Sequence, residues 1–102
     1  MITFPKKDPG EKFWISFNYA SELESGETIA SVSLTIEVTN GVDATPAAVM
    51  SGSPVIQTGD VVQLIQGGVA RVTYAFLCLA TTSAGRILAR AAKLPVQNAK
   101  NW

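Results

Sequence analysis

The feature that most limits how this chain can fold is a strict alternation of polar and apolar residues over positions 31–38, within the segment 29–38. A period of two places apolar side chains on one face of a β-strand and polar side chains on the other. One dry face and one wet face are typical of a strand in an antiparallel sheet. The pattern therefore predicts a strand whose core-facing side chains are Val32, Leu34, Ile36 and Val38.

The same alternation predicts long strands over residues 12–19 and 69–80. Shorter apolar runs, separated by turn residues, predict strands at 47–51, 55–56 and 61–65. We expect the core to be built from the apolar face of the three longest strands. Its predicted members are Phe13, Ile15, Phe17, Val32, Leu34, Ile36, Tyr74, Phe76 and Cys78.

The segment at residues 85–96 fits two interpretations. A helix is indicated by an apolar stripe at helical spacing, formed by Ile87, Leu88, Ala91 and Leu94. Against a helix, Gly85 would lie in the first turn and disfavour it by about 1 kcal/mol. The preceding strand also needs a neighbour, and residues 81–85 have the length of a hairpin loop. We favour a strand for this segment.

About six to seven short strands in one small chain predict a single immunoglobulin-like antiparallel β-sandwich, an all-β fold. With 102 residues, the chain has no room for a second core. We divide it into an irregular N-terminal lead-in (1–11), the sandwich domain (12–96) and a polar C-terminal tail (97–102). The single cysteine, Cys78, can form no disulfide within the chain, and its apolar neighbours predict a buried, unreactive thiol.

The composition lacks the residues from which active sites are most often built. There is no histidine, so the commonest general base and metal ligand is missing. Glu22, Glu24 and Glu27 lie in one polar loop, which we interpret as solvated surface. We therefore expect no enzymatic activity, no metal ion and no cofactor.

The charge balance argues against a nucleic-acid partner. Lys+Arg and Asp+Glu number 8 each, whereas proteins that bind phosphates carry a basic excess. The positive charges of Lys6, Lys7 and Lys12 are partly balanced by the negative charges of Asp8 and Glu11. We therefore interpret this segment as a solvated terminus. We also expect no signal peptide, no membrane-spanning run and no membrane partner.

Several large apolar side chains fall where a partner protein could bury them. Leu77 and Leu79 lie opposite the predicted core face of their strand, and the neighbours Ile87 and Leu88 cannot both point inward. If a second sheet covers these residues, they are core instead, and Trp14 can equally cover the core edge. The interface candidates are Trp14, Leu77, Leu79, Ile87, Leu88 and Trp102.

Four short motifs follow one another along the chain. They are Lys7-Asp8-Pro9, Gly26-Glu27-Thr28-Ile29-Ala30-Ser31, Gly67-Gly68 ahead of Tyr74, and Thr81-Thr82-Ser83-Ala84-Gly85-Arg86. In this order, over residues 4–96, they resemble a family of small tailed-bacteriophage virion proteins, described as phage fibre–tail adaptor or head–tail region proteins. The resemblance implies an immunoglobulin-like sandwich without catalysis and a hairpin at Gly85-Arg86. Arg71 stands where relatives carry a glycine.

The resemblance implies a structural virion subunit, made in the bacterial host cytoplasm, that acts as an adaptor in the tail or head–tail region. Its partners would be other virion proteins, tail or head–tail connector components, with the chain itself forming a homo-oligomer or ring. The alternative is a small module that binds carbohydrate or a host surface, with Trp14 or Tyr19 as a stacking platform. Self-association favours the adaptor, and sugar binding by a monomer favours the module.

Overall fold

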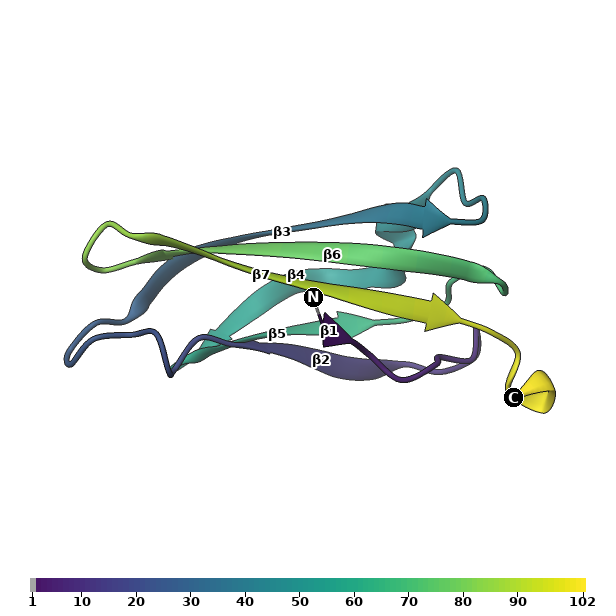
Figure 1. Ribbon diagram of the computed structural model, residues 1–102, viewed down its shortest axis with the longest axis horizontal. Helices are drawn as coiled ribbons and strands as arrows, with labels where there is room; N and C mark the ends of the chain where they lie inside the picture. Colours follow the sequence, from purple (N-terminus) through teal and green to yellow (C-terminus); the bar gives the residue numbers. More distant parts are fainter. Residues whose placement is uncertain (1) are drawn as a thin grey trace.

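A computed structural model describes residues 2–102 and shows two β-sheets packed face to face in a body 46 Å long (Figure 1). One sheet has four strands in the order β1-β7-β6-β3, and the other has three in the order β2-β5-β4. The prediction of an all-β sandwich is confirmed. No helix within residues 2–102 is long and apolar enough to cross a membrane. The elements are β1 (Ile2–Thr3), β2 (Phe13–Asn18), β3 (Ile29–Asn40), β4 (Met50–Gln57), β5 (Asp60–Ile65), β6 (Val72–Thr82), β7 (Ile87–Val96) and the 3₁₀ helices η1 (Pro46–Val49) and η2 (Ala99–Asn101).

The core lies between the two sheets and is centred on β6. This strand pairs antiparallel with β3 on one side and β7 on the other, so its inward side chains are covered from both sides. The Phe76 ring lies 6.4 Å from the ring of Phe17 on β2, which joins the two sheets. The predicted core residues that are buried are Ile15, Phe17, Tyr74, Phe76 and Cys78.

The remaining predicted core residues are partly buried and pack against this cluster; they are Phe13, Val32, Leu34 and Ile36. Three of them belong to β3, which is the border strand of its sheet. Side chains on a border strand have a neighbouring strand on one side only. Alternation therefore identified the correct face of β3, whereas the depth of burial depends on the place of the strand in the sheet.

The ambiguous C-terminal segment is a strand, as we favoured. β7 pairs antiparallel with β6 along its whole length, from Ile87 to Val96. The hairpin between them is closed by a bond from the Thr82 N–H to the Arg86 carbonyl at 2.8 Å. Gly85 in this loop has a φ of 83°, a conformation that glycine adopts without steric penalty.

The strand predicted at residues 47–51 is wrong in its first three positions, which belong to η1. Pro46 opens this 3₁₀ helix, and the fixed φ of proline suits the first helical position. The strand β4 begins at Met50 and joins the predicted strand at 55–56 into one element, with a register shift between Ser51 and Val55.

The N-terminal lead-in is not irregular throughout. β1 pairs in parallel with β7, and Lys7 forms a further bridge to Val96. The Phe4 ring packs edge-on against Phe17, with 6.2 Å between ring centroids. A strand of two residues is too short to give a periodic signal, which is why the sequence pattern missed it. Met1, which belongs to the predicted lead-in, lies outside the described residues.

Candidate interaction surfaces

The outer face of the four-stranded sheet carries an apolar patch. On this face Leu77 lies opposite Ala91, and Leu79 lies opposite Ala89. Leu77 is 42% exposed, and Ile87 at the end of the patch is 66% exposed. Contiguous exposed apolar side chains mark contact sites more often than isolated ones do. We call this surface the outer patch; its members are Ala75, Leu77, Leu79, Ile87, Ala89 and Ala91.

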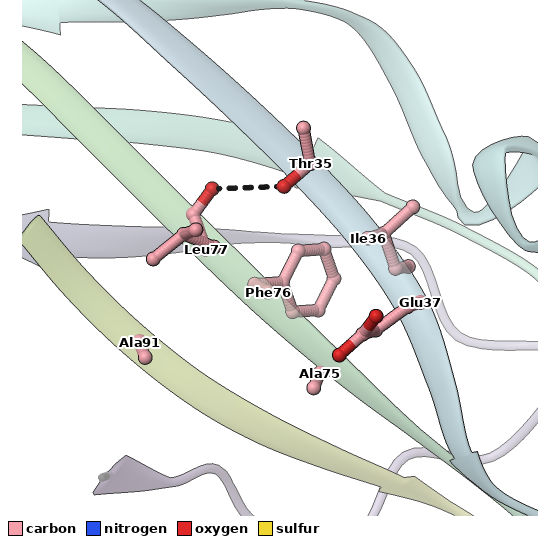
Figure 2. A pocket seen from close by; sticks show the side chains of 7 residues that line it. All are labelled: Thr35, Ile36, Glu37, Ala75, Phe76, Leu77 and Ala91. Atoms are coloured by element: carbon pink, nitrogen blue, oxygen red, sulfur yellow. Dashed lines mark hydrogen bonds between the residues drawn. The ribbon is translucent and has the colours of Figure 1, made fainter.

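Small side chains give the outer patch a hollow of about 310 Å³ (Figure 2). Its lining runs across three strands, from Ala91 on β7 through Ala75 and Leu77 on β6 to the β3 residues Thr35 and Glu37. The Thr35 hydroxyl donates a hydrogen bond to the Leu77 carbonyl at 3.5 Å. An apolar floor beside a polar rim is the composition of many protein–protein contact sites.

The three-stranded sheet carries a smaller apolar patch on its own outer face. Trp14 is 57% exposed and Val55 is 44% exposed. Together with Gln57 and Val62 they line a hollow of about 270 Å³. We call this surface the tryptophan patch. Because the two sheets pack core to core, the two patches face opposite directions. The members of the tryptophan patch are Trp14, Val55, Val62 and Leu64, which lie on the paired strands β2, β5 and β4.

Four of the interface candidates lie on these two outer faces: Trp14, Leu77, Leu79 and Ile87. Leu88 points the other way, opposite Ala80, and packs against the core, so it is not a surface candidate. Trp102 is 55% exposed, and its indole N–H donates to the Gln97 carbonyl at 2.9 Å within the C-terminal tail.

A polar cluster holds the β6–β7 hairpin at one end of the sandwich. The Arg86 guanidinium forms an ion pair with the Glu27 carboxylate, whose side chain is only 3% exposed. The Thr82 hydroxyl and the Glu24 N–H also donate to this carboxylate, at 2.5 and 2.9 Å. The interpretation of Glu27 as solvated surface is therefore wrong. Hydrogen bonds to the carboxylate lower the pKa of Glu27 from 4.5 to about 2. The largest effect comes from the Arg86 side chain, followed by the Glu24 N–H and the Thr82 hydroxyl.

We expect Glu27→Gln to flatten the acid end of the stability profile. A carboxyl with a depressed folded pKa stabilises the fold above its unfolded value of 4.5, and this contribution is lost as the pH falls through about 2. Thermal melts of the wild type and the variant between pH 2 and pH 7 test this. Glu24→Gln, in the same loop, is the matched control, and equal pH profiles for the two variants would contradict the prediction.

A second polar cluster lies at the opposite end, where β6 begins. Lys7 is 0% exposed, and its ammonium donates to the Gly67 carbonyl at 2.7 Å and the Asp8 carbonyl at 3.0 Å. Burial lowers the pKa of Lys7, against the raising effect of nearby Glu11 and Asp8. Lys7 is therefore a buried structural residue, and its interpretation as part of a solvated terminus is wrong.

Tyr19 cannot serve as an exposed stacking platform. Its side chain is 0% exposed, and its hydroxyl donates to the Cys78 carbonyl at 2.8 Å. The Arg90 guanidinium covers the ring at 4.9 Å. That hypothesis is wrong because Tyr19 follows the core-facing alternation of β2 past the end of the strand.

Within residues 2–102, no group of three or more His, Cys, Asp or Glu side chains gathers where it could hold a metal ion. Cys78 is buried, as expected, and this burial raises the pKa of its thiol.

The two polar clusters bring the four sequence motifs together in pairs. Lys7 contacts Gly67 across 60 residues, and Arg86 contacts Glu27 across 59. The sequence model of one protein family, described as podophage GP4 fiber-tail adaptor protein gp77, matches residues 7–95. Among curated proteins, no sequence matches the chain.

Proposed function

Since the chain belongs to the podophage GP4 fiber-tail adaptor protein family, we propose that it joins two other virion proteins through its two opposite outer faces. The observation that supports this proposal is the pair of exposed apolar patches on opposite sides of one rigid sandwich. An adaptor needs two separate contact surfaces, and a sandwich keeps them at a fixed distance.

As a member of this family, the protein is a component of the phage virion. We further propose that it is made in the host cytoplasm and assembles as a homo-oligomer or ring with tail or head–tail connector proteins. Its formal net charge of zero supports close packing of copies, because little charge repulsion separates them. The proposed role needs no catalytic step, no cofactor, no nucleic acid and no membrane.

We expect Leu77→Asp to weaken binding to one virion partner about tenfold or more, because a buried contact would receive an unpaired charge. Trp14→Ser should instead weaken binding to the other partner. The measurement is equilibrium binding of the purified chain to the fibre and tail proteins of the same phage, each tested separately.

Thr39→Asp is the control for Leu77→Asp, because Thr39 is exposed on β3 and lies outside the outer patch. Circular dichroism should show the same strand content in all variants. Unchanged binding of both partners by both patch variants would refute the assignment of these faces.

One observation favours a second function. Trp14 stands exposed beside a hollow, which is an arrangement that can stack on a sugar ring. A carbohydrate module would bind sugars as a monomer, and Trp14→Ser would remove that binding. Titration of host-surface oligosaccharides into the wild type, followed by tryptophan fluorescence, separates the two functions.

A further inference from the structure

Within residues 2–102, the edge of β3 that faces away from β6 has no paired strand, although the 3₁₀ helix η1 lies close to β3. β3 runs for 12 residues, and its register shifts lie only near its two ends. Such an edge is a template for another strand, and proteins usually block it with lysine, proline or a bulge. The strand Ile29–Asn40 contains neither lysine nor proline.

The other sheet edges are interrupted, covered or shorter. β4 has a register shift between Ser51 and Val55 and contains Pro54. The edge of β7 is covered in part by the N-terminal segment, where the Phe4 N–H donates to the Lys93 carbonyl at 2.8 Å. β2 has only 6 residues. The edge of β3 is therefore the one best able to accept a long strand.

The hydrogen-bonding groups on this edge follow from the ladder. At the end of β6, the Thr82 N–H bonds toward β7 at Arg86, and the Ser83 N–H bonds toward β3 at Thr28. Bonds alternate in an antiparallel ladder, so odd-numbered β6 residues pair by hydrogen bonds with their odd-numbered partners in β3. The β3 residues whose N–H and C=O groups point to the free edge are therefore Val32, Leu34, Ile36 and Val38.

The side chains of the same residues face the core but are only partly buried. A strand added at this edge would satisfy their backbone groups and cover their apolar side chains at once. The occupant must therefore be an extended segment with apolar residues at every second position. β3 itself has this pattern over the eight residues that the register shifts leave regular, Ser31 to Val38.

We propose that β3 pairs antiparallel with β3 of a second copy, about a twofold axis at Thr35, to form one continuous sheet across the dimer. This register places Val32 of one copy opposite Val38 of the other, and Leu34 opposite Ile36. It aligns the apolar side chains of both copies on the same face, where they extend the two cores into each other.

The charges of β3 permit this register. Glu37 is the single charged residue of the strand, and it falls opposite Ser33 of the other copy rather than opposite a second Glu37. Two Thr35 side chains meet at the axis on the outer face. Their backbone groups point to β6, so they form a non-hydrogen-bonded pair, in which side chains lie closest. The inference deepens the self-association of the proposed function and rests on it, whereas fibre and tail binding are measured separately.

Two lysine substitutions on one face of β3 should act in opposite directions. Ser33→Lys places an ammonium opposite Glu37 twice per dimer, which should tighten the dimer by about twofold to thirtyfold. Thr35→Lys places two ammonium groups opposite each other at the axis, which should weaken it by up to about fivefold. Sedimentation equilibrium of the full chain over a wide concentration range measures both dissociation constants.

Ser16→Lys adds the same charge on the exposed face of β2 and should leave the dimer unchanged. Circular dichroism establishes that each variant is folded. A monomer at all concentrations, an open-ended polymer, or a dimer that responds alike to Ser33→Lys and Thr35→Lys would overturn the inference. Fibre or tail binding that persists in any of these cases would leave the adaptor role standing.

Discussion

We expect Phe76→Ala to lower the free energy of unfolding by about 3–5 kcal/mol, the range for removing a buried phenylalanine. Phe76 is 1% exposed, lies on the central strand β6 and contacts the ring of Phe17 in the opposite sheet. The change would remove both the apolar burial and the ring contact between sheets. The free energy of unfolding of a small domain is about 5–15 kcal/mol in total, so this loss would be a large fraction of it.

Urea denaturation of the wild type and the variant measures this difference. Leu77→Ala is the matched control, because Leu77 is the next residue of the same strand, points outward and is 42% exposed. We expect that variant to lose no more than about 1 kcal/mol. A similar loss for the two variants would mean that the core does not lie on the Phe76 side of β6.

The fold was predictable because its long strands carry the period-two pattern that separates core from surface. In β6, the alternation correctly placed Tyr74, Phe76 and Cys78 inside and Leu77 outside. What the pattern does not contain is the order of strands within a sheet. Leu34 was therefore expected in the core, although its place on a border strand leaves it half-buried.

The two polar clusters were missed because their partners are distant in the sequence. Lys7 and Glu27 each lie among other charged residues, a local context that indicates solvated surface. Each is buried by a partner about sixty residues away, Gly67 and Arg86 respectively. The signal that could have found them was their place in the motifs of the family resemblance, because those motifs pair with one another in space.

The outer patch was only partly predictable. Leu77 and Leu79 were assigned outward from the alternation of β6, but Ile87 and Leu88 were equivalent until the register of β7 was known. Pairing of Leu88 with Ala80 turns Leu88 inward and leaves Ile87 exposed. Arg71 shows a different limit. It has a φ of 69°, a left-handed conformation that suits a glycine better than a residue with a side chain.

The second large effect is expected from the loss of one hydroxyl at the start of β6. Tyr74 is 0% exposed, and its hydroxyl donates to the Asp43 carboxylate at 2.6 Å. The same oxygen accepts the Val69 N–H at 2.9 Å. This one group therefore ties two loops to the sandwich, the one that follows β3 and the one that precedes β6.

We expect Tyr74→Phe to lower the free energy of unfolding by about 1–3 kcal/mol at neutral pH. The ring is kept, so the loss comes from the Asp43 carboxylate and the Val69 N–H, which are left without this partner. Phe76→Tyr would be a poor control, because it adds a buried hydroxyl. Thr45→Val is better, since it removes a hydroxyl that also bonds Asp43, at 3.5 Å, from an exposed position.

The pH dependence separates the hydroxyl from a general loss of packing. Burial raises the pKa of Tyr74 from 10 to about 12, and the hydrogen bond to Asp43 is the second largest cause. A group with a raised folded pKa stabilises the fold fully below its unfolded value of 10, and this contribution is lost as the pH rises through about 12. Tyr74→Phe lacks that contribution, so its stability should fall less steeply than that of the wild type between pH 10 and pH 12. The pKa of Tyr19 is also raised, but Tyr19 is present in both proteins. Its contribution to the pH dependence of stability therefore cancels when the two proteins are compared. Urea melts across this range test the prediction, and parallel curves would show that the Tyr74 hydroxyl is not held in the native state.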